Sequence, residues 1–173
     1  MEKKDVFLVY DNACFYEIVI LCYFMQFAKC NMVFCSLDGA VVRVMEGFSV
    51  NVDMALKEID KEQIRSFIVP GGGISAIDND EITHYLQDLN DRKVLIAGIC
   101  AGVDILDKAG LLEERISTHS TEEDFASDEN IVTARANAYV DFAIEVAKKL
   151  SLFKDEEDLQ ETIGFWKNHN RIQ

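Results

Sequence analysis

The feature that most constrains this chain is a regular alternation of short apolar runs with longer stretches of helical periodicity. Apolar, β-branched or aromatic runs occupy residues 5–10, 66–69 and 93–97, and each ends at a turn signal. Continuous apolar strands of this kind are typical of parallel sheets that helices cover on both faces. The sequence therefore predicts an α/β fold with a mostly parallel sheet, in which ligands bind beyond the carboxyl ends of the strands.

The other segments fit the same alternation. Helices are predicted at 15–29, 82–90, 101–109, 139–150 and 155–168, and the polar segment 53–65 is compatible with a helix. Further strands are predicted at 32–37, 41–45, 116–118 and 131–134, with a hairpin-type turn at Asp38 and Gly39. We interpret the acidic run 122–129 as a solvated loop.

Length, charge and cysteine usage bound the class of protein. The chain has 173 residues, 49% of them hydrophobic, which predicts one domain over 1–173 with a core at about 5–150 and a helical extension at about 155–170. Its formal net charge of -14 argues against binding to nucleic acid or to an anionic membrane surface. No apolar stretch reaches the roughly 20 residues of a membrane span. The five cysteines form no CxxC pair, so we expect reduced thiols and a cytoplasmic protein.

One cysteine stands at a strand-to-helix junction. The stretch GICAG, residues 98–102, has the spacing of a nucleophile elbow, in which small residues let a strand turn sharply into a helix with the nucleophile at the bend. At a helix N-terminus, the dipole and the free N–H groups favour the thiolate and lower the pKa of Cys100. The alternative is a buried, inert cysteine beside two packing glycines, and this motif alone does not decide between them.

Two further features would serve such a thiolate. Glycines 71–73 follow the strand at 66–69, and their N–H groups together with that of Ala101 could form an oxyanion hole, unless this is an ordinary glycine turn. Glu17 lies near the start of a helix that is otherwise apolar or weakly polar until Gln26. Burial would raise the pKa of Glu17 and keep it protonated, able to donate to a thiolate, whereas the simpler reading is a first-turn Glu favoured by the helix dipole.

The histidines give a weaker signal. His119 ends the strand predicted at 116–118, where an active-site base would lie, although a lone histidine there is more often structural. We interpret His84 and His169 as surface residues, and no pair of histidines is spaced for metal binding. Neither a phosphate-loop nor a dinucleotide-binding motif is present. We expect no metal and no cofactor.

Taken in order along the chain, these features resemble the ThiJ/PfpI superfamily, which includes the DJ-1 proteins and shares the class I glutamine amidotransferase fold. The resemblance covers about 5–150 and depends on the combination rather than on one motif. It rests on a first strand, Glu17 on the first helix, VPGGG at 69–73, IAGICAG at 96–102, Thr118 with His119, and IVTAR at 131–135.

The resemblance implies a flavodoxin-like three-layer sandwich with a strained, acidic elbow cysteine, Cys100. It also implies that Glu17 is a protonated carboxyl in contact with the thiolate. By the same comparison Gly72 and Ala101 offer oxyanion N–H groups, and His119 is the nearby imidazole. Proteins of this superfamily are usually dimers.

In the DJ-1 branch the first helix lies in the subunit contact. The resemblance therefore implies a homodimer through residues 15–28, which would account for a helix that is apolar on nearly every side.

Departures from the family pattern narrow the activity. Ala101 stands where the protease-like branch has His, and no C-terminal His-x-Glu pair is present, so peptidase and amidotransferase activities are not expected. Val103 replaces a Pro of the DJ-1 branch, and Arg135 is followed by Ala-Asn-Ala instead of a Gly-Pro turn. These changes reshape the pocket wall and leave the substrate open.

Two functions follow from the resemblance. In the first, Cys100 is the nucleophile of a cofactor-independent enzyme, glyoxalase III-like, deglycase-like or hydrolase-like, acting on a small electrophile such as methylglyoxal, with Glu17 and His119 moving protons. In the second, the protein is a non-catalytic sensor of oxidative stress, or a protective protein, through reversible oxidation of Cys100.

Overall fold

Seven strands form one sheet in the computed structural model, which describes residues 3–171. Their order across the sheet is β5-β2-β1-β6-β7-β9-β8, and every neighbouring pair is parallel except β8 and β9. The strands are β1 (Lys4–Leu8), β2 (Met32–Ser36), β5 (Met54–Ala55), β6 (Ile64–Val69), β7 (Leu95–Ile99), β8 (Phe125–Asp128) and β9 (Ile131–Ala134). The predicted fold class, a mostly parallel sheet in an α/β fold, is confirmed.

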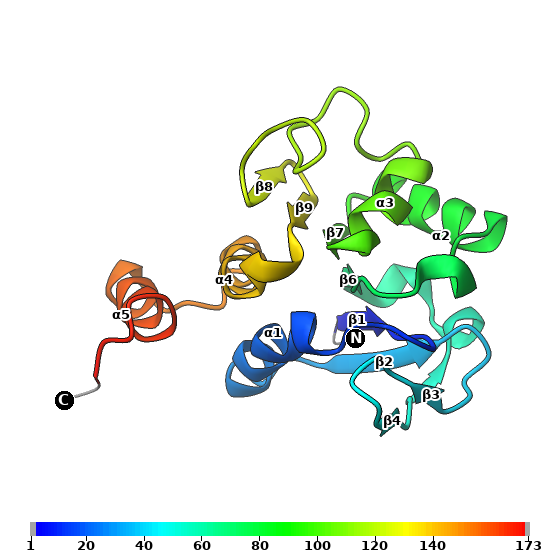
Figure 1. Cartoon of the computed structure of the whole chain (residues 1–173), viewed down its shortest axis with the longest axis horizontal. Helices are drawn as coiled ribbons and strands as arrows, with labels where there is room; N and C mark the ends of the chain where they lie inside the picture. Colours follow the sequence, from blue (N-terminus) through cyan, green and yellow to red (C-terminus); the bar gives the residue numbers. More distant parts are fainter. Residues whose placement is uncertain (1–2, 172–173) are drawn as a thin grey trace.

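Four helices cover the two faces of this sheet (Figure 1). They are α1 (Tyr16–Phe27) and α4 (Tyr139–Lys149) on one face, and α2 (Asp80–Asp91) and α3 (Ala101–Lys108) on the other. Side chains alternate along each strand, so Phe7 and Ile68 pack with α1 and α4, whereas Val6 and Phe67 pack with α2 and α3. The chain therefore has two buried cores, one on each side of the sheet.

A fifth helix, α5 (Glu156–Trp166), lies outside α1 and α4 (Figure 1). Its N-cap is Asp155, whose side chain accepts a hydrogen bond from the Asp158 N–H. Trp166 packs edge-on against Tyr23 and Phe24 of α1, with ring centroids 5.7 and 5.8 Å apart. Part of the second apolar side of α1 is thus covered within the same chain.

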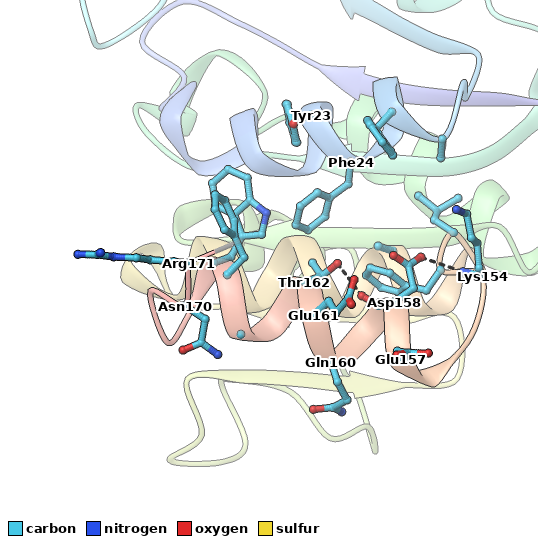
Figure 2. Close-up of a pocket in the computed structure, with 18 residues that line it drawn as sticks. Tyr23, Phe24, Lys154, Glu157, Asp158, Gln160, Glu161, Thr162, Asn170 and Arg171 are labelled. Atoms are coloured by element: carbon cyan, nitrogen blue, oxygen red, sulfur yellow. Dashed lines mark hydrogen bonds between the residues drawn. The ribbon is translucent and has the colours of Figure 1, made fainter. Parts of the chain in front are cut away.

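A groove of about 960 Å³ remains between α5 and α1, away from the carboxyl ends of the strands. Figure 2 shows Tyr23 and Phe24 on its α1 side and Asp158 and Thr162 on its α5 side. Along α1, Tyr23 stays 55% exposed and Phe27 81% exposed, so an apolar surface is still open there. Pairing of two chains through residues 15–28 stays a prediction.

The hairpin predicted around Asp38 and Gly39 is wrong. β3 (Val42–Arg43) pairs with β4 (Ser49–Val50) in a separate two-stranded sheet, whereas β2 lies between β1 and β5. The Asp38 carboxylate accepts the Ala40 N–H at 2.9 Å, which closes a local turn. This turn directs the chain away from β2 instead of back along it.

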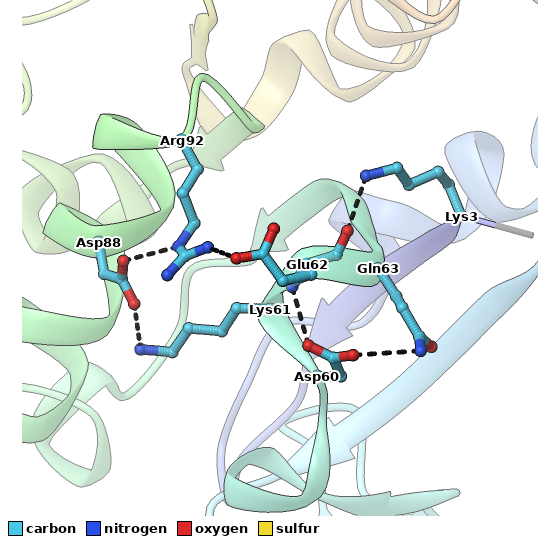
Figure 3. Close-up of polar contacts among 7 residues, drawn as sticks. All are labelled: Lys3, Asp60, Lys61, Glu62, Gln63, Asp88 and Arg92. Carbon is cyan, nitrogen blue, oxygen red and sulfur yellow. Dashed lines mark hydrogen bonds and ion pairs between the residues drawn. The ribbon is translucent and has the colours of Figure 1, made fainter. Parts of the chain in front are cut away.

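The segment 53–65 is not a helix. It contains β5, two short 3-10 turns and the start of β6. Asp60 caps the start of the second turn, because its side chain accepts the Glu62 N–H at 3.0 Å. Figure 3 shows the second turn tied to α2, where the Arg92 side chain bridges Glu62 and Asp88.

Two predictions near the last strands are also wrong. Residues 116–118 form a turn because their N–H groups find side-chain acceptors: Ile116 donates to Asp128 at 2.8 Å and Thr118 to Thr133 at 3.0 Å. The acidic run 122–129, interpreted as a loop, contains the edge strand β8, which is antiparallel to β9. Pairing with β9 overrides its polar composition.

At the amino ends of the strands, a buried ion pair joins β1 to β6. Asp5 is fully buried, and its carboxylate accepts hydrogen bonds from Arg65 Nε at 3.0 Å and from the Ser66 hydroxyl at 2.7 Å. Arg65 Nη2 also donates to Asp5. These contacts form in the strand register in which Asp5 lies opposite Ser66 and Val6 lies opposite Phe67.

Among residues 3–171, no helix is long and apolar enough to cross a membrane.

We expect Gly102→Ala to lower the free energy of unfolding by about 2 kcal/mol, because packing an extra methyl group against backbone strains the fold. A Cβ at Gly102 of α3 would lie 2.2 Å from the Val69 carbonyl oxygen. The control is Gly164→Ala in α5, whose Cβ would lie 2.8 Å from the movable Asn170 amide and should cost much less. Urea unfolding of both variants tests this, and equal losses would contradict it.

Candidate active site

The candidate site lies where three neighbouring strands end. β1, β6 and β7 are adjacent and parallel, so the segments that follow them meet at one edge of the sheet. From β1 the chain passes to β2 on one side, while β6 lies on the other side, which makes this a topological switch point. Residues 10–17, 70–73 and 100–101 come together there.

Cys100 is bent into a strained conformation between β7 and α3. Its φ of 56° and ψ of -130° lie in a region that costs a non-glycine residue about 1–3 kcal/mol. Its N–H donates to the Ala134 carbonyl at 2.9 Å, which holds the bend against β9. Gly102 allows the bend, because its missing Cβ lets α3 approach the Val69 carbonyl. The sharp strand-to-helix turn that the GICAG spacing predicts is present.

The glycine loop at 71–73 lies directly against this cysteine. A Cβ on Gly71 would lie 2.6 Å from Cys100 Cβ and 3.0 Å from its sulfur. The N–H groups of Gly72 and Ala101 both hydrogen-bond the sulfur in its charged form, and each lowers the pKa of Cys100. The two backbone donors that the family resemblance implies therefore both act on the pKa of this sulfur.

Glu17 reaches the same place from the first turn of α1. Only 1% of Glu17 is exposed, and its Oε2 accepts the Gly71 N–H at 2.6 Å. Burial raises its pKa to about 7, against the opposing effects of the Gly71 N–H and the Cys100 thiol. Among residues 3–171, its Oε1 has no hydrogen-bond partner of good geometry, so this oxygen is free to serve the thiol or a ligand.

The pKa of Cys100 depends on this carboxyl. Burial raises the pKa of the Cys100 thiol, and a negative charge on Glu17 raises it further, which outweighs the two N–H groups. The lowered pKa that the sequence predicts for Cys100 is therefore wrong, because burial and the charge on Glu17 raise it. When Glu17 holds a proton, its charge disappears and it can donate to the sulfur, so Glu17 and Cys100 titrate as a pair.

His119 lies on the outer side of α3. Its Nε2 is 3.1 Å from the Asp104 carboxylate and its Nδ1 is 3.4 Å from the Asp107 carboxylate. Within residues 3–171, no hydrogen bond or ion pair joins His119 to Cys100 or Glu17. Its part in catalysis stays a prediction.

Sequence reasoning missed Tyr10 and the backbone contact of Cys14. The Tyr10 hydroxyl donates to the carbonyls of Pro70 at 2.6 Å and Gly71 at 2.8 Å, which fixes the glycine loop. Cys14 donates its N–H to the Gly71 carbonyl at 2.9 Å. A polar aromatic residue at the end of a strand was the only signal for Tyr10, because its acceptors lie about sixty residues away in the sequence.

The fold and site define an α/β protein with an elbow cysteine beside a buried carboxyl. A model of the DJ-1/PfpI family matches residues 3–149, and the chain belongs to this family.

Three similar proteins illustrate this membership. The "Uncharacterized protease YdeA" of Bacillus subtilis is 27% identical over 158 residues, which are 81% of this chain and 79% of that protein. The "Deglycase TK1284" of Thermococcus kodakarensis is 32% identical over 74 residues, covering 42% of this chain and 45% of that one. A DJ-1 superfamily protein, Atu0886 from Agrobacterium tumefaciens, is alike in structure, with a TM-score of 0.84 and 24% identity over 97% of this chain and 100% of that chain. This last likeness shows the fold.

Titration of Glu17 should make stability depend on pH. A carboxyl whose pKa rises from 4.5 to about 7 on folding favours the folded state below pH 4.5, and this contribution is lost as the pH rises through 7. We expect the free energy of unfolding of the wild type, minus that of Glu17→Gln, to fall by about 3 kcal/mol between pH 4 and pH 8. Urea unfolding across this range measures it, and a constant difference would contradict it.

Proposed function

We propose that this protein is a cofactor-independent enzyme in which the Cys100 thiolate adds to a small carbonyl electrophile of the α-oxoaldehyde class. One observation carries the proposal: the buried Glu17 carboxyl, with one oxygen unpartnered, lies at a strained elbow cysteine that two backbone N–H groups face. Strained backbone conformations and buried acids with shifted pKa values both cluster at active sites.

The first step would form a bond between the sulfur and the aldehyde carbon of methylglyoxal. The carbonyl electrons move to oxygen, which takes a proton from Glu17 and gives a hemithioacetal. The N–H groups of Gly72 and Ala101, which face the sulfur, are placed to stabilise charge on the sulfur before addition and on oxygen during it.

The second step moves a proton. The Glu17 carboxylate removes the hydrogen from the carbon bound to sulfur, and a proton returns at the neighbouring carbonyl carbon, which converts the hemithioacetal into a thioester. Water then cleaves the thioester and releases Cys100. The sum is one α-oxoaldehyde plus one water giving one 2-hydroxy acid, with no net oxidation.

The names of the relatives support two reaction classes. Two archaeal relatives are named deglycases, which favours carbonyl adducts derived from aldehydes as substrates. Two Bacillus subtilis relatives are named uncharacterized proteases. Peptide hydrolysis needs a group that protonates the leaving amine, and the residue after Cys100 is Ala101, whose side chain carries no proton. The carbonyl chemistry is therefore the class we propose.

Lactate formation from methylglyoxal tests this function. We expect Cys100→Ser to reduce the rate by roughly a hundredfold or more, because an alcohol at this site is a much weaker nucleophile than a thiolate. Cys30→Ser is the matched control, because Cys30 is also partly exposed but interacts with Arg65. Equal rates for the wild type and Cys100→Ser would overturn the proposal.

Redox sensing through Cys100 is the second candidate function. It is favoured by the same N–H groups of Gly72 and Ala101, which would hold the oxygens of an oxidised sulfur. Under mild hydrogen peroxide we expect Cys100 to oxidise faster than the buried Cys35, as measured by mass spectrometry of the tryptic peptides. Oxidation of both cysteines at one rate would remove this candidate.

A further inference from the structure

Two cysteines lie on opposite sides of the same glycine loop. On one side, Cys14 donates its N–H to the Gly71 carbonyl at 2.9 Å, and Ala13 pairs with Gly72 in an isolated antiparallel bridge. On the other side, Cys100 lies against Gly71 so closely that a Cβ there would meet its sulfur at 3.0 Å. Both cysteines therefore lie against the same short glycine loop.

Both thiols are partly accessible, and a charge on Cys100 affects Cys14. Cys14 and Cys100 are partly exposed, whereas Cys35 is buried. A charge on Cys100 contributes to the raised pKa of Cys14, about 11, although burial and Glu17 contribute more. The Cys14 sulfur lies 3.5 Å from the sulfur of Met45, a residue that is 54% exposed.

The other cysteines have different surroundings. Cys30 follows α1 and accepts a hydrogen bond from Arg65, at the amino end of β6. Cys35 lies within β2, paired in register with Leu8 and Met54. Cys14, unlike Cys30 and Cys35, lies in the segment just before α1 and contacts the glycine loop that lies against Cys100.

We propose that Cys14 is the resolving thiol of Cys100, so that a hydroperoxide converts this pair into an intramolecular disulfide across the Gly71 and Gly72 loop. The inference rests on the reactive Cys100 of the proposed function. The Cys100 thiolate attacks the outer peroxide oxygen, the O–O bond breaks, and the products are a sulfenic acid and an alcohol or water. The Cys14 thiol then displaces hydroxide from the sulfenic sulfur, forming the S–S bond and releasing water.

The disulfide protects the nucleophile. A sulfenic acid that meets a thiol stops at the disulfide, which a dithiol reduces, whereas an unresolved one proceeds to the sulfinic acid, which a dithiol does not reduce. Oxidation would thus inactivate Cys100 reversibly. Cys14 would determine whether a dithiol can restore the Cys100 thiol.

Peptide mapping after oxidation tests the inference. Trypsin leaves Cys14 and Cys22 on one peptide, residues 5–29, and Cys100 on another, residues 94–108, so all variants carry Cys22→Ser. The Cys22→Ser protein, and the same protein with Cys14→Ser or Cys30→Ser, are treated with a small excess of hydrogen peroxide. They are then alkylated under denaturing, non-reducing conditions and digested.

We expect the Cys22→Ser and Cys30→Ser proteins to yield a cross-linked pair of peptides 5–29 and 94–108, lighter by two hydrogen atoms than the reduced pair. The Cys14→Ser protein should lose this pair and show a several-fold rise in Cys100 carrying two added oxygen atoms. A dithiol should restore lactate formation in the first two proteins and not in the third.

Two results would overturn the inference: equal sulfinic oxidation of Cys100 with and without Cys14, or a disulfide from Cys100 to Cys30 or Cys35. Neither result bears on the proposed function, which is measured before oxidation. At that stage Cys14→Ser should turn over methylglyoxal normally. Failure of the proposed function is a separate result, in which Cys100→Ser does not change lactate formation.

Discussion

The close approach of α3 to the end of β6 is the contact on which the rest of the site depends. Gly102 lies so near the Val69 carbonyl that a Cβ would come within 2.2 Å of its oxygen. α3 begins directly after Cys100, whose φ is 56°, and the Ala101 N–H lies against the glycine loop. The strain at the cysteine is thus maintained by backbone packing rather than by the side chains that take part in the chemistry.

Burial of an acid beside a thiol then gives the site its electrostatic character. Glu17 is removed from water, which raises its pKa to about 7, and it carries a charge or a proton according to small changes around neutrality. The sulfur of Cys100 responds because the carboxyl is its charged neighbour. One proton shared between these groups can therefore decide whether the site presents a thiol beside a carboxylate or a thiolate beside a carboxylic acid.

Much of this arrangement could be predicted from the sequence, because apolar strands, glycine spacing and a carboxyl in an apolar helix are local signals. The elements β9, α2 and α3 lie close to where the sequence placed them. Two of the failures depended on partners outside the segment: residues 116–118 donate to β8 and β9 side chains, and 53–65 is held by α2. Tyr10 and Cys14 contact a loop that is distant in the sequence, so the local sequence pattern does not predict these contacts.

The buried Asp5 and Arg65 pair has a consequence for the opposite end of the sheet. Strand pairing has a period of two, so a slip of one residue between β1 and β6 would turn every side chain to the wrong face. It would also pull the fully buried Asp5 carboxylate away from Arg65, and a buried charge left without its partner costs far more than the loss of an exposed pair. The ion pair therefore favours one register of β1 against β6. In that register Tyr10 and Gly71, which follow these two strands, lie within hydrogen-bond distance of each other.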